Sequence, residues 1–279
     1  MRQILKILIP LLTAFLYFWQ GRIELENVEA SLYMSKKYDD SALTVVTYNI
    51  RGCRDNEGEA DPIAIAEELG KLGADIIALQ EVDNRLPRSG FVNQAKTIAQ
   101  HLQMNYVYAP SINFLIGTYG NALLSNRPIL SSRVIPLPFF LEPRSLLDVV
   151  IDVNGSPFHV YTTHLGLKKS ERIEQLQYLR EYLHTKDNRA AVLLGDFNTR
   201  AADPLLAPLR AFFQDPLFRR KQELVTVSGR STYGMIDHIF LSHDLTFVQA
   251  YSPMTGRSDH YPVTLQLELP ISAKKAFAP

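Results

Sequence analysis

The sequence has little cysteine and no excess of charge of either sign. Cys53 is the single cysteine among 279 residues, which excludes an intrachain disulfide framework and any multi-cysteine zinc or iron–sulfur site. The 29 Lys and Arg residues balance 29 Asp and Glu residues, so the formal net charge is zero. Proteins that hold nucleic acid by bulk charge carry an excess of basic residues, so the composition disfavours that class.

The chain also lacks the composition of a disordered or fibrous protein. Hydrophobic residues make up 46% of the sequence and charged residues 21%, which is typical of a globular protein long enough to bury a substantial core. After residue 42 no linker rich in Gly, Pro or Ser interrupts the chain, and no internal repeat is visible. We therefore expect packing, rather than cross-links, to hold the fold together.

The N-terminus has the pattern of an export signal. Arg2 and Lys6 precede an apolar run over residues 7–19, and acidic residues follow it. Because basic residues favour the cytoplasmic side of a membrane, this order predicts that the body of the protein lies outside the cytoplasm. The run is shorter than the roughly 20 apolar residues of a full span. Residues 28–30 resemble a cleavage site but lie far from the run, so an uncleaved membrane anchor is favoured over a secreted, cleaved form. A buried amphipathic helix is the alternative.

The rest of the chain alternates between short apolar runs and amphipathic segments. Runs rich in β-branched and aromatic residues predict strands at 43–48, 76–79, 106–109, 122–124, 134–137, 146–153, 158–163, 191–194, 236–241, 245–251 and 263–269. So many strands with few helices indicate an α/β fold in which two sheets pack face to face with helices outside. The domains expected are an N-terminal signal segment at 1–30, a linker at 31–42, one globular domain at 43–270 and a tail at 271–279.

Three helices are expected from apolar residues at helical spacing. One opens at Asp61 and Pro62, an N-cap and first-turn pair, and closes at Gly73, with Ile63, Ala66, Leu69 and Leu72 on one face. A second covers residues 94–102. The third runs from a Ser170 cap to His184, with an apolar face formed by Ile173, Leu176, Leu179 and Leu183.

Polar side chains follow the apolar strands at the points where the strands are expected to end. They are carboxylates, amides and imidazoles, which can bind a hard divalent cation, donate hydrogen bonds to a phosphate and move a proton near neutral pH. Each is open to a plainer interpretation: Asn198 as a turn residue, His164 as a structural histidine, Glu81 as a solvated strand end. The residues are Asn49, Glu81, His164, Asp196, Asn198, Asp237 and His260.

The order of these motifs resembles that of the endonuclease/exonuclease/phosphatase superfamily. The resembling segments are Thr47-Tyr48-Asn49-Ile50, Leu79-Gln80-Glu81-Val82, Tyr119-Gly120-Asn121-Ala122-Leu123-Leu124-Ser125, Thr163-His164-Leu165, Gly195-Asp196-Phe197-Asn198, Ile236-Asp237-His238 and Ser258-Asp259-His260. Together they span nearly all of the chain from residue 43 onward. The resemblance implies a four-layer α/β sandwich of two face-to-face mixed β-sheets with helices outside, which agrees with the two sheets expected from the strand pattern.

The resemblance also implies a role for each residue. Glu81, Asn49 and Asp259 would bind Mg²⁺ or Mn²⁺. His260 would be the catalytic histidine, oriented by Asp237. Asp196 would align or deprotonate the attacking water, and Asn198 and His164 would donate to phosphate oxygens. Tyr119, Asn121, Arg144 and Arg51 would contact the substrate, although a surface ion pair is an equal alternative for both arginines. Water would attack in line, without a covalent enzyme intermediate, and Cys53 would take no part.

The substrate is left open between classes. The Thr163–Leu167 segment, with Glu142-Pro143-Arg144 and Glu171-Arg172, is similar to a bacterial, membrane-anchored subgroup of metal-dependent hydrolases. The anchor and the neutral charge favour a phosphodiesterase or phosphatase acting on a phospholipid or its headgroup. An exported nuclease is the alternative, since Arg219, Arg220 and Lys221 provide local positive charge, and a non-catalytic binding module is the third hypothesis. Residues 135–141, with adjacent Phe139 and Phe140, are interpreted as a hairpin rather than a membrane-facing loop. No protein partner is inferable.

Overall fold

The computed structural model describes residues 41–228, 234–254 and 256–270. The expected signal segment at 1–30, all but two residues of the expected linker, and the tail at 271–279 lie outside these ranges. Ala42, the last expected linker residue, begins the first strand. Within the described ranges, no helix combines the length and the apolar character needed to cross a membrane.

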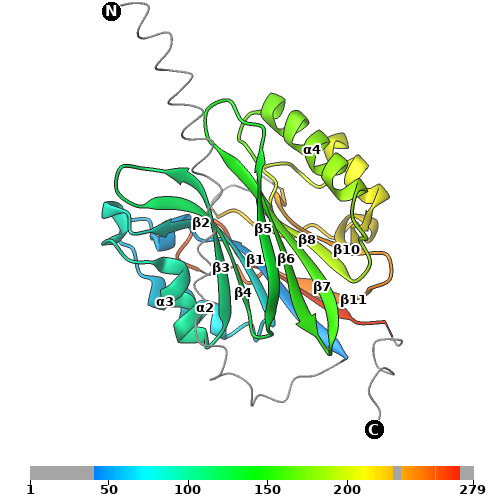
Figure 1. Cartoon of the computed structure of the whole chain (residues 1–279), viewed down its shortest axis with the longest axis horizontal. Helices are drawn as coiled ribbons and strands as arrows, with labels where there is room; N and C mark the ends of the chain where they lie inside the picture. Colours follow the sequence, from blue (N-terminus) through cyan, green and yellow to red (C-terminus); the bar gives the residue numbers. More distant parts are fainter. Residues whose placement is uncertain (1–40, 229–233, 255, 271–279) are drawn as a thin grey trace, which may run out of the picture.

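The strands form two mixed six-stranded sheets (Figure 1). The first has the order β11-β12-β1-β2-β4-β3. Its strands are β1 (Ala42–Asn49), β2 (Ile76–Asn84), β3 (Asn105–Asn113), β4 (Thr118–Ser125), β11 (Thr246–Tyr251) and β12 (Val263–Glu268). The second has the order β5-β6-β7-β8-β10-β9. Its strands are β5 (Ile129–Leu137), β6 (Arg144–Val153), β7 (Ser156–His164), β8 (Ala191–Asp196), β9 (Phe213–Gln214) and β10 (Asp237–Ser242).

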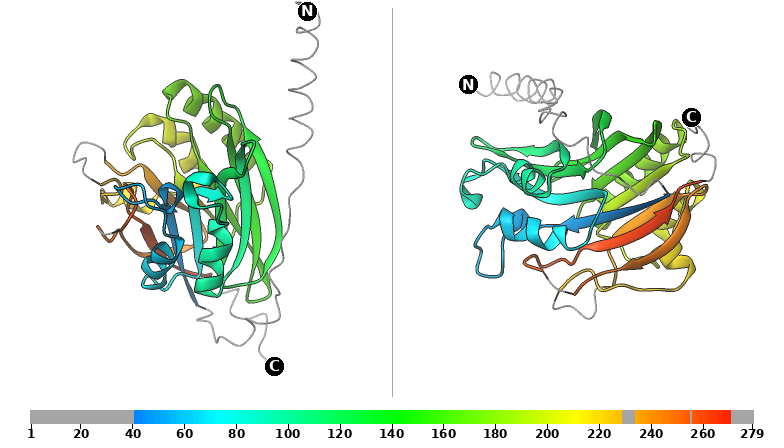
Figure 2. Two further views of the ribbon diagram at one scale, coloured as in Figure 1. Left: turned by 90° about the vertical axis from the view of Figure 1, so that its left-hand side faces the viewer. Right: turned by 90° about the horizontal axis from the view of Figure 1, so that it is seen from below.

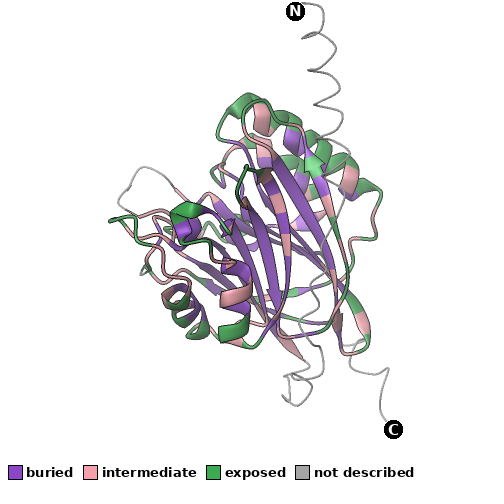
Figure 3. Ribbon diagram, turned by 60° about the vertical axis from the view of Figure 1, so that its left-hand side comes forward, coloured by how far each residue is buried: buried purple, intermediate pink, exposed green. Residues whose placement is uncertain are grey.

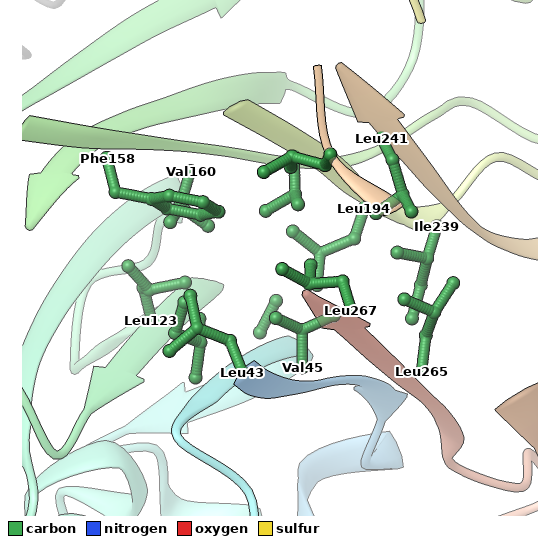
Figure 4. Close-up of a cluster of buried hydrophobic side chains, with 14 of the residues drawn as sticks. Leu43, Val45, Leu123, Phe158, Val160, Leu194, Ile239, Leu241, Leu265 and Leu267 are labelled. Atoms are coloured by element: carbon green, nitrogen blue, oxygen red, sulfur yellow. The ribbon is translucent and has the colours of Figure 1, made fainter. Parts of the chain in front are cut away.

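The space between the sheets is filled by one apolar cluster. Figure 4 shows Leu43 and Val45 of β1 and Leu265 and Leu267 of β12 approaching Phe158, Val160, Leu194, Ile239 and Leu241 of the facing sheet. Successive strand residues point to opposite faces, so Val46 and Tyr48 of β1 pack on the other side, against helices. Because both faces of the central strands are covered, β1 and β8 are buried almost without alternation (Figure 3).

Helices cover the outer face of each sheet (Figure 2). α2 (Pro62–Gly70) and α3 (Gln94–Leu102) pack Ile65, Leu69 and Ile98 on the first sheet. α4 (Lys169–His184) and the 3₁₀ helix η3 (Pro204–Ala211) cover the second. Three short helices complete the fold: η1 (Arg51–Cys53), η2 (Pro87–Ser89) and α5 (Pro216–Arg219). The order helix, sheet, sheet, helix confirms the expected four-layer sandwich.

Two of the helix predictions were wrong in detail. Asp61 is the expected N-cap, with Oδ1 accepting from the backbone N–H of Ile63 and of Ala64. Ser170, however, lies inside α4, which begins one residue earlier without a side-chain cap. Ile63 and Ile173 were expected on buried faces, but they are 41% and 47% exposed. The buried residues are Ile65, Ala66 and Leu69 in α2 and Gln175, Leu176, Leu179 and Leu183 in α4.

Strand β2 does not end at Leu79 as expected. Its pairing with β4 shifts register between Leu79 and Val82 and then continues to Asn84. Glu81 lies in this irregularity with a φ of 59°, in the left-handed region that non-glycine residues seldom adopt. The two consecutive polar residues in the sequence therefore mark a β-bulge, which turns the Glu81 side chain away from the regular alternation of the strand.

Candidate active site

The site residues meet where β1 and β2 of one sheet and β7 and β8 of the other come to their carboxyl ends. The parallel registers place Asn49 opposite Gln80 and His164 opposite Asp196. The antiparallel strand β10 begins with Asp237 opposite Asp196. Asn49 Nδ2 then crosses between the sheets to Asp196 Oδ2, a hydrogen bond of 3.1 Å. Residues from three separate parts of the sequence are thereby fixed around one carboxylate.

Asp196 is the centre of the cluster and is almost fully buried. Its Oδ2 lies 3.5 Å from His164 Nε2 and 3.8 Å from His260 Nε2, and its Oδ1 accepts a 2.9 Å hydrogen bond from the Asn198 backbone N–H. Burial, together with the neighbouring Asp237 carboxylate, raises the pKa of Asp196 to about 7. The preceding residue is Gly195, where a Cβ would overlap the Thr163 carbonyl oxygen of the neighbouring strand.

His260 and Asp237 form a pair beside Asp196. His260 Nδ1 lies 3.0 Å from Asp237 Oδ2 and 3.3 Å from Oδ1. Burial alone would lower the pKa of His260, but the carboxylates of Asp237, Asp196 and Asp259 outweigh it and raise the pKa to about 10. The imidazole is therefore a cation at neutral pH, with its Nδ1–H donated to Asp237 and its Nε2–H directed toward Asp196.

His164 differs from His260 in its charge. Arg144 Nη1 lies 3.0 Å from His164 Nδ1, and because a guanidinium can only donate, Nδ1 must accept and the ring proton must sit on Nε2. Burial, with Arg144 and His260 nearby, lowers the pKa of His164 well below its usual value. His164 is thus a neutral Nε2–H donor facing Asp196. The same Arg144 nitrogen lies 3.2 Å from Oε1 of the partly exposed Glu142, so this buried arginine has two partners.

Glu81 and Asn49 lie side by side at the bulge in β2. Asn49 Nδ2 donates to Glu81 Oε1 at 3.1 Å, and Asn49 Oδ1 accepts from the Arg51 backbone N–H. Tyr119 and Asn121 lie across from the bulge on β4, where Ala122 pairs with Leu79 and Gly120 with Val82. Asn121 Nδ2 is buried without a hydrogen-bond partner among the described residues. A buried unpartnered donor on the strand that faces the bulge indicates a place that a polar ligand occupies.

Three other predicted residues, Asp259, Arg51 and Asn198, lie at the edge of the cluster and contact groups other than Asp237 and His260. Asp259 is half exposed, 3.8 Å from the Nε of a partly exposed Arg51, so Arg51 forms the ion pair that was its alternative interpretation. Asn198 has a φ of 47°, and its Nδ2 donates to the Leu165 carbonyl at 2.9 Å, which ties the loop after β8 to the loop after β7. One amide proton of Asn198 is left for another acceptor.

Several supporting residues had no role in the sequence-based interpretation. Ser258 Oγ donates to the Asn49 carbonyl at 2.7 Å and lies 3.2 Å from the His260 backbone N–H, so it fixes the histidine to the end of β1. Gln80 bridges the sheets through Thr47 and Thr162. Both belong to the quoted motifs, which was the available signal. The ion pair between the buried Asp83 and the partly exposed Arg88, with Arg88 over the Tyr119 ring at 5.3 Å, gave no such signal.

The cluster offers two sets of metal ligands. One atom each of Asp196, Asp237 and His260 lie within 4.8 Å of one another, close enough for a metal ion to bind all three. Glu81 with Asn49 forms a second set, made of oxygen donors only. Mg²⁺ and Mn²⁺ favour such oxygen ligands, whereas a histidine ligand must be neutral.

Comparison with known proteins agrees with this geometry. The model of the Endonuclease/Exonuclease/phosphatase family matches residues 46–260. The chain is 28% identical over 146 residues to the uncharacterized protein YbhP of Escherichia coli K12, a match that covers 48% of this chain and 57% of YbhP. It is 24% identical over 174 residues to tyrosyl-DNA phosphodiesterase 2 of Xenopus laevis, covering 60% of this chain and 44% of that protein. The chain thus spans about half the length of these relatives.

The fold also matches solved structures. An endonuclease/exonuclease/phosphatase from Beutenbergia cavernae superposes with a TM-score of 0.67 at 23% sequence identity, covering 82% of this chain and 72% of that one. The family match includes all the motif residues gathered around Asp196, from Asn49 to His260. The chain therefore belongs to the endonuclease/exonuclease/phosphatase family, a family of metal-dependent phosphoester hydrolases.

Proposed function

We propose that this protein hydrolyses a phosphoester by direct attack of water, with Asp196 as the general base and His260 as the opposing proton donor. The observation that carries the proposal is the short distance between two groups whose pKa values differ. Asp196, at a pKa of about 7, and His260, at about 10, lie 3.8 Å apart at the junction of the two sheets. A carboxylate that is basic near neutral pH beside a fixed cation suits proton removal from water and stabilisation of a phosphoryl oxygen.

Each surrounding side chain has a part in this reaction. Above pH 7 the Asp196 carboxylate accepts the proton of the water. His260 keeps Nδ1–H on Asp237, which leaves Nε2–H to donate to an oxygen that gains negative charge. His164, neutral and protonated on Nε2, and Asn121, with its unpartnered amide, supply further donors. Water is the nucleophile in this proposal, and the Ser258 hydroxyl beside His260 is donated to the Asn49 carbonyl, so the reaction forms no covalent enzyme intermediate.

We assign the Mg²⁺ or Mn²⁺ ion to Glu81 and Asn49, with Asp259 close by, rather than to the set that includes His260. The carboxylates that hold a proton on His260 also prevent its nitrogens from acting as ligands. A bound ion supplies charge stabilisation at the phosphoryl group and the leaving oxygen. Glu81 and Asn49 fit such an ion because both offer oxygen ligands and lie within 3.1 Å of each other.

The metal assignment predicts unequal effects of two conservative changes. Glu81→Gln should raise the Mn²⁺ concentration needed for half-maximal activity by about 10- to 100-fold, because a charged oxygen ligand is lost. Asp237→Asn should lower the rate with little change in that concentration. Titration of activity with Mn²⁺ measures both. A metal requirement that shifts for Asp237→Asn and not for Glu81→Gln would assign the ion to the other set.

Cys53 should be dispensable. It is fully buried, and burial with Asp83 nearby raises the pKa of its thiol well above the usual value, so the reactive thiolate is absent at neutral pH. Cys53→Ala should keep turnover within about twofold of the wild type. In the native protein the thiol should react with Ellman's reagent only after unfolding. A variant of unchanged melting temperature that had lost its activity would contradict the water mechanism.

For the substrate, we propose a phospholipid or its headgroup phosphoester, met outside the cytoplasm by a membrane-anchored enzyme of the bacterial subgroup. Two features of the sequence support this. The zero net charge disfavours long nucleic acid, and the apolar run at residues 7–19 suits an anchor. A nuclease is the second candidate, because one relative is named tyrosyl-DNA phosphodiesterase 2. In the structure, however, Arg220 stacks over the Phe247 ring at 4.5 Å, so part of the basic segment is engaged.

A substrate panel separates these candidates. The full chain is supplied with Mg²⁺ or Mn²⁺ and with phospholipid vesicles, supercoiled plasmid or sugar phosphates, and Asp196→Ala is the inactive control. Headgroup release that chelator abolishes is the expected result. Plasmid nicking that His260→Ala abolishes, without release of any lipid headgroup, would identify a nuclease instead.

A further inference from the structure

Seven large apolar side chains are exposed to solvent on two hairpin loops and one strand-to-helix loop. We call them the apolar rim: Phe114, Leu115 and Ile116 between β3 and β4, Phe139, Phe140 and Leu141 between β5 and β6, and Leu167 after β7. Among the large apolar residues that the structure describes, the four most exposed all belong to this rim: Leu115 at 101%, Phe140 at 77%, Leu167 at 72% and Leu141 at 67%. Patches of this kind mark interaction sites.

The apolar rim lies next to the catalytic cluster. The β3–β4 loop ends just before Tyr119, the β5–β6 loop ends at Arg144, and Leu167 follows His164 by three residues. A 3.1 Å hydrogen bond between Ser111 and Ser145 joins the two hairpins across the two sheets. Both hairpin loops extend from the same end of the sandwich (Figure 1). A surface that covers the apolar rim therefore lies next to the catalytic cluster.

The β5–β6 loop is held with its apolar side chains outward. Glu171 Oε1, on α4, accepts hydrogen bonds from the backbone N–H of Phe140 and of Leu141 at 3.0 and 3.2 Å. Gln175 Nε2 donates to the Pro138 carbonyl at 2.9 Å. With its backbone fixed to the helix in this way, the loop does not fold its phenylalanines inward, so their exposure is built into the structure.

The charge around the apolar rim complements an anionic surface. Lys168 Nζ lies 5.2 Å from the centre of the Phe140 ring, and Lys169 is exposed, 3.9 Å from Asp203. The nearby carboxylates are engaged, Glu171 with backbone N–H groups and Glu142 with Arg144. The rim combines four aliphatic side chains with three phenylalanines, which suits acyl chains, whereas a nucleic-acid platform would combine aromatic stacking with arginines.

The segment before β1 is long enough for the apolar rim to face the membrane that would hold the N-terminal anchor. β1 begins at Ala42, at the end opposite to Asn49 and the site. Residues 20–41, between the apolar N-terminal run and β1, number 22 and can span at most roughly 70–80 Å. An eight-residue strand such as β1 is about 26 Å long. An anchored chain therefore has ample length to turn its rim toward the bilayer that holds the anchor.

We propose that the apolar rim docks on the surface of an anionic phospholipid bilayer and so delivers a lipid phosphoester to the site. This inference rests on the proposed lipid substrate and makes it more specific: the enzyme would act on phosphate at an interface, with Phe140 and Leu115 among the acyl chains and Lys168 among the headgroups. Free, water-soluble headgroups would be poorer substrates.

Tryptophan fluorescence tests the docking without relying on activity. In a Trp19→Phe background, which removes the single native tryptophan, Leu115→Trp and Phe140→Trp are reconstituted in phosphatidylglycerol vesicles that contain acyl-brominated lipid. Both should be quenched. Leu130→Trp is the matched control, since Leu130 is 57% exposed near the other end of β5. Quenching at position 115 or 140 no stronger than at 130 would overturn the proposal.

Turnover separates failure of docking from failure of the proposed function. For Leu115→Ser with Phe140→Ser, the ratio of turnover on vesicle lipid to turnover on a soluble diester should fall by about tenfold or more. An unchanged ratio would overturn docking while leaving the lipid substrate intact. Soluble-diester turnover without hydrolysis of any lipid would overturn the substrate instead. A wild-type dimer that this double change converts to a monomer would assign the rim to a second copy and also overturn the proposal.

Discussion

Replacing His260 by alanine is expected to lower kcat for an activated phosphodiester such as bis(p-nitrophenyl) phosphate by about 10²- to 10⁴-fold. The imidazolium is held 3.0 Å from Asp237, and its Nε2–H is the cationic donor nearest to Asp196. Without it, the negative charge that develops on the phosphoryl oxygens loses a fixed and partly desolvated donor. Steady-state kinetics at saturating Mn²⁺ measures the loss. His101→Ala, which removes an exposed histidine of α3, is the matched control.

The pH profile of the wild type belongs to the same prediction. Asp196 is basic only above its pKa of about 7, so kcat should rise with pH through that value. His260 is acidic only below its pKa of about 10, so kcat should fall as pH passes it. Asp237→Asn removes the carboxylate that most raises the pKa of His260 and should move the falling limb to lower pH. A limb that stays in place would contradict the role assigned to this pair.

Asp196→Asn is the second change with a large expected effect. It preserves the size of the side chain but removes the only carboxylate of the cluster that contacts Asn49, His164 and His260 together, so kcat should fall by about 10²- to 10⁴-fold. The fold should not suffer. Burial raises the pKa of Asp196, so above pH 7 the ionised carboxylate opposes folding, and its removal should leave the melting temperature at pH 8 unchanged or higher.

Two measurements accompany the Asp196 variant. Asp187→Asn, in an exposed loop, provides the control for loss of a carboxylate elsewhere and should keep full activity. Titration with Mn²⁺ then distinguishes a base from a metal ligand. If excess Mn²⁺ restored kcat to Asp196→Asn, Asp196 would be holding the ion, and the assignment of the base would be wrong.

The sequence predicted the layers of this fold better than the connections between them. Apolar runs such as 191–194 are fully buried strands, and their composition predicts them because both faces are covered. The order of strands in each sheet depends on pairings between distant segments, which local patterns do not record. The bulge at Glu81 was mistaken for a strand end because two polar residues interrupt the apolar run, although the strand resumes at Val82.

The candidate site shows the same division. The residue types at expected strand ends indicated metal, phosphate and proton chemistry, but the residues Asn49 and Asp196 lie 147 positions apart, and no spacing rule brings them together. The family resemblance supplied that link. It did not supply the tautomer of His164, which follows from its contact with Arg144, nor the role of Ser258 in fixing His260 to β1. The apolar rim was visible in the sequence only as adjacent phenylalanines in an expected hairpin.

The most direct test of the account is the turnover of bis(p-nitrophenyl) phosphate by the full chain, measured with Mn²⁺, after removal of the metal by chelator, and with Asp196→Asn in place of the wild type. The account predicts p-nitrophenol release that depends on the metal, is restored when Mn²⁺ is returned, and is at least about 10²-fold slower in the variant. Release that survives exhaustive chelation, or that is equal in the variant, would contradict it.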